Sequence, residues 1–220
     1  MGHGERSRNS MSQKQALIVW GGWDGHQPEE VAGILAGVLR EEGYGVEVSD
    51  TLDSFRDEER LAGVDLIVPV WTMGKIEKEQ LTPLINAVKV GGTGIAGCHG
   101  GMADSFRNEV EYQYMVGGQW VAHPGNDGVT YTVRMKDSEQ PLTKGIGDFV
   151  VVSEKYYMHV DPAIKVHAVT DFDDVEMPVV WTKTYGAGKV YYNSLGHQAN
   201  IVRMPETLEL MRRGMLWATR

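Results

Sequence analysis

The first half of the chain alternates short apolar runs with segments of helical periodicity. Ala16–Trp20 is a continuous apolar run, which is typical of a parallel strand covered on both faces. Glu29–Glu41 carries apolar residues at helical spacing on one side, and Gly43 follows it as a stop signal. This alternation predicts a doubly wound α/β domain with a mostly parallel sheet. Further strands are predicted at Val46–Val48, Asp65–Trp71 and Thr93–Cys98, and a further helix at Lys75–Val90.

Two prolines modify this pattern. Pro69 lies inside the run Asp65–Trp71, and because proline cannot donate a ladder hydrogen bond, it indicates an edge position or a bulge. Pro83 lies inside Lys75–Val90 and predicts a kink or a break in that helix.

The second half of the chain is rich in β-branched and aromatic runs. Val129–Met135 alternates between faces, so part of this half is predicted to be an antiparallel excursion. An amphipathic helix beginning near Pro205, a favourable first-turn residue, closes the chain. Residues 14–220 are predicted to form one domain, because no repeat or linker divides them, and residues 1–13 a disordered or cloning-derived tail. Further β-runs are Phe149–Val152, Lys165–Thr170, Met177–Lys183 and Lys189–Asn193.

Charge and cysteine content narrow the class of partner. The 220 residues carry a formal net charge of −9. Nucleic acids and anionic membranes both select basic patches, so neither is expected as a partner. A single cysteine excludes an intrachain disulfide. No segment has the pattern of a secretory signal or a membrane span, and the expected compartment is the cytoplasm.

The segment Gly91–Gly101, GGTGIAGCHGG, predicts a buried strand that runs into a tight strand-to-helix elbow. Such elbows hold one side chain at the carboxyl end of a sheet in a strained backbone conformation. The flanking glycines lie two residues before and two after the elbow residue, because a Cβ there would clash. Gly97 and Gly101 have this spacing about His99. We therefore expect His99 on the elbow with positive φ, and Cys98 pointing back into the sheet.

Polar and aromatic residues gather after the predicted strands, where ligands of open parallel sheets bind. Glu154, beside two tyrosines, is predicted to be a general base with a raised pKa. Trp23, Trp71, Trp120 and Trp181 are each typical core residues, but two or three lining one cleft would form a stacking surface for a sugar ring. The candidate site residues are His26, His99, Trp120, His123, Glu154, Tyr157, His159 and His197.

Several motifs occur together along the chain. They are His26 after a Gly-rich strand end, the elbow at Gly97–Gly101, GGxWxxHP at Gly117–Pro124, PLTKGI before Asp148, SExYY at Ser153–Tyr157, YGAGKVYYNSLGH at Tyr185–His197 and the helix ending Leu216-Trp217-Ala218. In these motifs the chain resembles the ThuA-like proteins, a trehalose-utilisation family with a class I glutamine-amidotransferase-like fold. The resemblance spans nearly everything from Ala16 onward and implies a flavodoxin-like three-layer α/β sandwich with a mostly parallel central sheet and an added antiparallel excursion.

The departures from true amidotransferases exclude glutamine hydrolysis. Those enzymes place a cysteine on the elbow and a glutamate two residues after a late histidine. Here His99 occupies the elbow, and His197 is followed by Gln198 and Ala199. Cys98 could be a displaced nucleophile, but the favoured interpretation is that it is a small buried core residue.

The resemblance implies processing of an oxidised sugar, such as a 3-keto-glycoside, by elimination, hydrolysis or isomerisation. Glu154 or His197 is expected to be the base and His99 the contact to the developing oxyanion. His26, Trp120, His123, Tyr157 and His159 are expected to bind the substrate. The alternative is a non-catalytic sugar-binding or regulatory protein on the same fold. A cleft holding titratable groups would favour the enzyme.

No cofactor is predicted. No two histidines have the short spacing of a ligand pair on one helix or strand, although His26, His99, His123 and His197 could converge in space to hold a transition metal. The expected partners are a small sugar derivative and a sugar dehydrogenase of the same pathway. The sequence leaves a homo-oligomer open.

Overall fold

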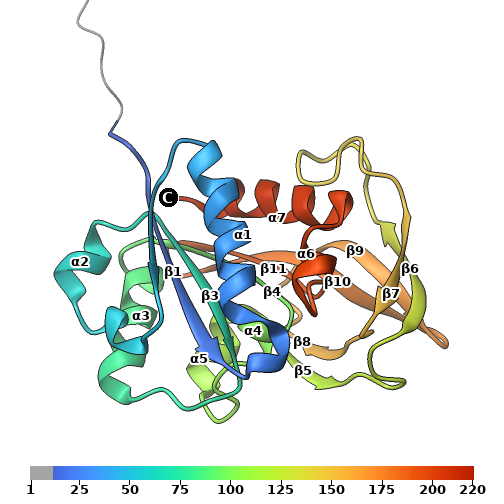
Figure 1. Ribbon diagram of the computed structural model, residues 1–220, viewed down its shortest axis with the longest axis horizontal. Coiled ribbons are helices and arrows are strands. Elements are labelled where there is room, and N and C mark those ends of the chain that lie inside the picture. Colours follow the sequence, from blue (N-terminus) through green and yellow to red (C-terminus); the bar gives the residue numbers. More distant parts are fainter. Residues whose placement is uncertain (1–11) are drawn as a thin grey trace, which may run out of the picture.

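A mixed nine-stranded sheet forms the centre of the computed structural model, which describes residues 12–220 (Figure 1). Residues 1–11 of the predicted tail lie outside the described residues. The strand order is β2-β1-β3-β4-β11-β10-β9-β6-β7, parallel from β2 to β11 and antiparallel from β11 to β7. The strands are β1 (Gln15–Gly22), β2 (Gly45–Ser49), β3 (Leu66–Thr72), β4 (Gly94–Cys98), β6 (Val129–Met135), β7 (Phe149–Ser153), β9 (Lys165–Phe172), β10 (Val175–Tyr185) and β11 (Gly188–Asn193).

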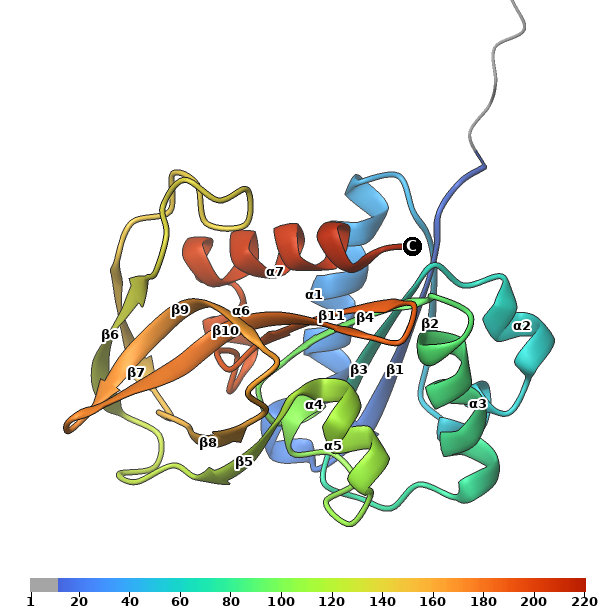
Figure 2. The same ribbon diagram turned by 180° about the vertical axis from the view of Figure 1, so that it is seen from behind.

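Helices cover both faces of the sheet, as the alternation of side chains along the strands requires. Ile18 of β1 packs in the core beneath α1, α6 and α7, whereas the adjacent Leu17 packs on the opposite face with α2, α3 and α5 (Figures 1 and 2). This three-layer arrangement confirms the predicted fold class. The helices are α1 (Pro28–Glu41), α2 (Glu58–Ala62), α3 (Lys78–Lys89), α4 (Gly100–Ala103), α5 (Val110–Val116), α6 (Ala199–Val202) and α7 (Pro205–Ala218).

The edge position or bulge expected at Pro69 and the break expected at Pro83 were wrong. Pro69 lies in β3, an interior strand, and pairs with Val19 of β1 without a register shift. The strand tolerates it because β3 pairs with β4 only over Leu66 and Ile67, so that ladder has ended before the proline. Helix α3 runs unbroken through Pro83.

Helix α3 begins three residues later than the predicted Lys75. The side chain of Gln80 accepts a hydrogen bond from the amide of Glu77 at 2.8 Å and thereby caps the first turn.

Two short strands lie outside the large sheet. β5 (Gly118–Ala122) and β8 (Tyr157–Val160) form a separate antiparallel pair. Among the described residues, no helix has the length and apolar character needed to cross a membrane.

His167 offers a test of the core through the pH dependence of stability. Its ring nitrogen Nε2 lies 2.7 Å from the hydroxyl of Thr182, both are buried, and burial lowers the pKa of His167 from 6.5 to about 4. The unfolded chain therefore binds more protons between these pH values, and stability should fall as the pH is lowered through this window. The loss should reach about 2–4 kcal/mol, at about 1.4 kcal/mol for each unit of pKa.

The measurement is denaturant unfolding at pH 7 and pH 4.5. His167→Gln should be less sensitive to acid than the wild type, whereas His159→Gln, at an exposed position, should retain the wild-type slope. Parallel pH profiles for His167→Gln and the wild type would contradict a neutral, buried His167.

Candidate functional site

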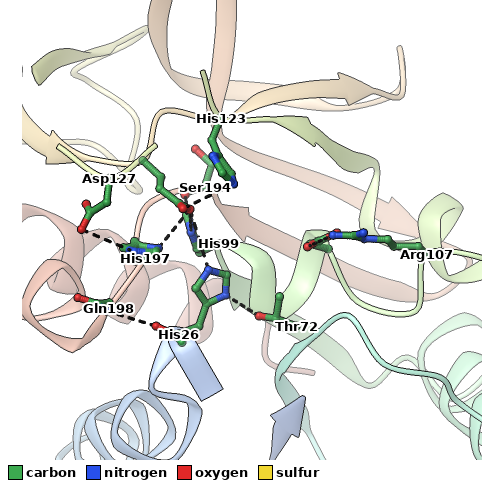
Figure 3. Close-up of polar contacts among 12 residues, drawn as sticks. His26, Thr72, His99, Arg107, His123, Asp127, Ser194, His197 and Gln198 are labelled. Carbon is green, nitrogen blue, oxygen red and sulfur yellow. Dashed lines mark hydrogen bonds and ion pairs between the residues drawn. The ribbon is translucent and has the colours of Figure 1, made fainter. Parts of the chain in front are cut away.

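The carboxyl ends of three parallel strands bring three histidines together. His26 lies in the short 3-10 helix that follows β1, His99 directly follows β4, and His197 follows β11. Their imidazole centroids are separated by 4.7 Å (His26 to His99), 5.2 Å (His26 to His197) and 5.4 Å (His99 to His197). Figure 3 shows these rings, with His123, directed toward one region.

His99 occupies the strained elbow, as the glycine spacing predicts. Its φ is 51° and its ψ is −146°, and its amide donates to the carbonyl of Asn193 at 2.7 Å. A Cβ on Gly97 would lie 2.8 Å from Met102, and one on Gly100 would lie 2.7 Å from the ring of His26. Only glycine therefore permits this approach of the elbow to its neighbours.

Cys98 points into the core and is not the reactive group. It is 4% exposed within the apolar layer beneath α1 and α7, and burial raises the pKa of its thiol to about 12. Because the thiolate is the nucleophilic form, a cysteine in this state is unreactive at neutral pH. The burial of Cys98 therefore argues against the alternative of a cysteine hydrolase.

Glu154 places a carboxylate at the centre of the histidines. It follows β7, at the far edge of the sheet, and the hydroxyl of Tyr131 donates to its backbone carbonyl at 2.9 Å. Its Oε2 lies 3.0 Å from Nε2 of His99, 3.1 Å from Nδ1 of His197 and 4.0 Å from Nε2 of His26. Its Oε1 lies 3.6 Å from Nε2 of His123.

The second nitrogen of each of the three strand-end histidines also has a polar neighbour. Nδ1 of His99 donates to the carbonyl of Ser194 at 2.8 Å, and Nδ1 of His26 lies 2.7 Å from the hydroxyl of Thr72 (Figure 3). Nε2 of His197 lies 3.8 Å from the carboxylate of Asp127. These contacts fix the orientation of the rings toward the central carboxylate.

The pKa of Glu154 is shifted in the direction opposite to the prediction. Burial by itself would raise this pKa, but the contacts from His197 and His99 outweigh burial and hold the pKa well below its usual range. The expectation of a carboxylic acid with a raised pKa was therefore wrong, because the sequence did not reveal the two imidazoles. Glu154 is an anion in the folded protein.

Two of the histidines have lowered pKa values. Burial, with the neighbouring His99 and His197, lowers the pKa of His26 to about 3. Burial also lowers the pKa of His99, in spite of its contact with Glu154. Four potential ligand atoms, from His26, His99, Glu154 and His197, all lie within 4.8 Å of one another. Neutral imidazoles and one carboxylate are the donor types that bind transition metals.

A cavity of about 180 Å³ opens beside this cluster. His26, His123 and Glu154 line it, whereas His99 and His197 are not among its lining residues. Trp23 and Trp120 form parts of its wall, and Tyr156, which stacks on His99 with ring centroids 4.0 Å apart, contributes another. The remaining lining residues are Thr72, Met73, Asp104 and Arg107.

Two predicted substrate-binding residues lie elsewhere. Tyr157 packs against Phe172 and His159, with centroid separations of 5.4 Å and 6.4 Å. His159 lines a different groove of about 290 Å³ beside β5 and β8. Trp181 is fully buried in the core.

Sequence analysis missed several residues at the cavity. Tyr156 adjoins the predicted Tyr157 and lines the cavity in its place. Asp104 and Arg107 form a two-contact ion pair at 2.6 Å and 2.9 Å, and the guanidinium lies 4.9 Å from the ring of Trp120. No pattern in the sequence pointed to Asp127.

Comparison with known proteins finds similar sequences and folds. The family ThuA, described as trehalose utilisation, matches residues 15–218. No match to a curated protein is found. A ThuA-like protein from Parabacteroides merdae superposes with a TM-score of 0.76 at 16% identity, over 94% of this chain and 90% of that chain.

Two further structures extend the comparison. A ThuA-like protein from Bacteroides uniformis gives a TM-score of 0.77 at 15% identity, over 97% of this chain and 95% of that chain. A β-galactosidase from Bacillus circulans gives 0.60 at 12% identity, over 94% of this chain and 31% of that chain. At these identities the likeness concerns the fold alone.

Proposed function

Because this chain belongs to the ThuA family, which is linked to trehalose utilisation, we propose that it is an enzyme acting on an oxidised sugar such as a 3-keto-glycoside. The observation that supports this best is the buried cluster of histidines around Glu154 beside a small cavity. Ionisable groups with perturbed pKa values in a cavity are characteristic of catalytic sites. A sugar-binding protein would need the aromatic wall but not this cluster.

The size and walls of the cavity fit a small ligand. Its volume of about 180 Å³ lies below the ~300–1,000 Å³ of pockets for drug-sized molecules, which favours a single sugar ring at the reacting position. Trp23 and Trp120 supply aromatic surface, and the carboxylate of Asp104 can accept from sugar hydroxyls.

A ketone at carbon 3 makes the chemistry accessible without a covalent nucleophile. It acidifies the hydrogen on carbon 2, so a base can remove that proton while the charge moves to the ketone oxygen. The returning electron pair expels the glycosidic oxygen from carbon 1, which takes up a proton and leaves as an alcohol. Addition of water to the resulting double bond completes a net hydrolysis.

We assign the proton transfers to His123. It lines the cavity with a side chain 30% exposed, and its Nε2 lies 3.6 Å from Oε1 of the anionic Glu154. A carboxylate in this position orients an imidazole for proton transfer. Glu154, which the sequence favoured as the base, instead orients His123. Its lowered pKa makes the Glu154 carboxylate a weak proton acceptor. His99 and His197 position Glu154.

The test is to incubate the purified full-length chain with 3-keto-trehalose and, separately, with trehalose. The proposal expects release of the alcohol from the keto sugar only, and exchange of the carbon-2 proton in deuterated water. Binding of either sugar without turnover or exchange would favour a sugar-binding protein instead. The supplier of such a substrate would be a dehydrogenase that oxidises the carbon-3 hydroxyl, in the same compartment, for which we propose the cytoplasm.

Trp120 should contribute to binding rather than to chemistry. Its indole Nε1 is buried and finds no hydrogen-bond partner among residues 12–220, while the residue lines the cavity. Trp120→Phe keeps an aromatic ring and removes this donor. We expect KM to rise about three- to tenfold with kcat little changed, the effect of losing one hydrogen bond of about 1 kcal/mol. Trp217→Phe, on α7, is the matched control, and an equal effect in both variants would exclude a specific contact.

A further inference from the structure

The geometry around Glu154 has the features of a metal centre. The side chains of His26, His99, His197 and Glu154 are at most 10% exposed, and they come from four separate segments of the chain. We propose that these four residues bind one divalent transition-metal ion, with zinc the first candidate. Metal binding is inferred from the donor atoms alone, whereas the use of the ion rests on the proposed function.

The distances between donor atoms suit a common ion. Bonds of about 2.0–2.1 Å in a tetrahedron separate neighbouring ligand atoms by about 3.4 Å. Oε2 of Glu154 lies 3.0, 3.1 and 4.0 Å from the nearest nitrogens of His99, His197 and His26. Small shifts of buried rings would bring these separations to those of a four-ligand site.

The contacts of His99 direct one ring nitrogen at Glu154. The carbonyl of Ser194 can only accept, so Nδ1 of His99 donates to it and Nε2 is left facing the carboxylate. Nε2 and Oε2 of Glu154 lie 3.0 Å apart, and a positive charge between them, carried by a proton or a metal ion, stabilises this approach. A metal ion supplies that charge.

His197 distinguishes a metal ion from a shared proton. Its Nδ1 is buried, is 3.1 Å from the same carboxylate oxygen and makes no hydrogen bond within the described part of the chain. One proton between His99 and Glu154 would leave this nitrogen without a partner. A metal ion between His197 and Glu154 would give this nitrogen a partner.

The outer contacts resemble those that support metal ligands. A ligating histidine normally directs its other nitrogen to a carbonyl, a carboxylate or a similar group, which fixes the ring and its tautomer. His99 has Ser194, His26 has Thr72 and His197 has Asp127 in these positions.

The position of the cluster would make the ion useful for the proposed reaction. His26 and Glu154 belong to the cluster and also line the cavity, so an oxygen atom of the substrate could approach the bound ion. A bound divalent ion acts as a Lewis acid toward a ketone oxygen.

The test measures metal binding without any sugar. The full chain, purified without a histidine tag and dialysed against a chelator, is titrated with zinc chloride by calorimetry, and its zinc content is measured after dialysis. We expect one ion per chain. His197→Ala and His99→Ala should weaken zinc binding by about a hundredfold or more, since each loses a ligand and the outer contacts alone account for about 10–100-fold.

His159→Ala, in the separate groove, is the matched control and should bind zinc like the wild type. Because His99 stands on a strained elbow, Asp127→Asn provides a surface variant that should fold and bind about tenfold more weakly. Absence of stoichiometric zinc in the wild type, or wild-type affinity in His197→Ala, would overturn the metal site. Either result leaves the sugar assay to decide the proposed function separately.

Discussion

Glu154→Gln is expected to lower kcat on a 3-keto-glycoside by about a thousandfold, within the ~10²–10⁴ range for loss of acid–base function. The carboxylate is the common neighbour of His26, His99, His123 and His197, at 3.0 to 4.0 Å. A neutral amide removes the negative charge at the centre of these rings, so His123 loses the carboxylate that orients it. The NH2 group of the amide would also place hydrogen-bond donors opposite ring nitrogens that the carboxylate faces as an acceptor.

The effect should fall on kcat rather than on KM, because Glu154 acts most strongly as charge develops during proton transfer. Steady-state kinetics with the keto sugar, together with carbon-2 proton exchange in deuterated water, would measure it. Glu41→Gln, an exposed carboxylate at the end of α1, is the matched control and should behave as the wild type. Unchanged turnover and exchange in Glu154→Gln, in a variant that melts like the wild type, would contradict the central role of this carboxylate.

Gly94→Ala should destabilise the fold by about 3 kcal/mol or more, at or above the upper end of the usual cost of overpacking. Gly94 begins β4 beneath the last residues of α7. A Cβ there would lie 1.9 Å from the carbonyl oxygen and 2.6 Å from the carbonyl carbon of Ala218. Both obstacles are backbone atoms, so no rotation of a side chain can relieve the contact. Helix α7 or the start of β4 must move.

Chemical denaturation of the variant and the wild type would measure this loss. Gly33→Ala is the matched control, because Gly33 lies exposed in α1 with open space around its Cα. Alanine is the better helix former, so this variant should gain about 0.5–1 kcal/mol. Equal stability of Gly94→Ala and the wild type would show that α7 does not pack on β4 as closely as described.

The order of strands and helices was predictable because it depends on local periodicity. The continuous apolar run Ala16–Trp20 and the alternating Val129–Met135 correctly indicated a parallel strand and an antiparallel strand. The edge position or bulge predicted from Pro69 was wrong, because the cost of a proline in a strand depends on whether a neighbouring strand needs the missing amide hydrogen. That neighbour, β4, pairs elsewhere along β3.

His99 was also accessible to sequence reasoning. The glycines on either side of His99 mark positions where a Cβ would clash. This steric requirement is local to one turn of the chain, so the sequence shows it directly. The positive φ of 51° confirms the expectation. Tyr156 rather than the predicted Tyr157 lines the cavity, because Tyr157 begins β8 and its ring packs against Phe172.

The sequence by itself determined the alternating α/β architecture, the antiparallel excursion and the residue on the elbow, since each follows from periodicity or from local backbone sterics. Only the tertiary structure decided that Glu154, from the far edge of the sheet, meets His99 and His197, and that these contacts lower its pKa rather than raise it. Distances and burial between residues remote in the chain set electrostatic energies. Neither quantity is encoded in the local pattern around Glu154.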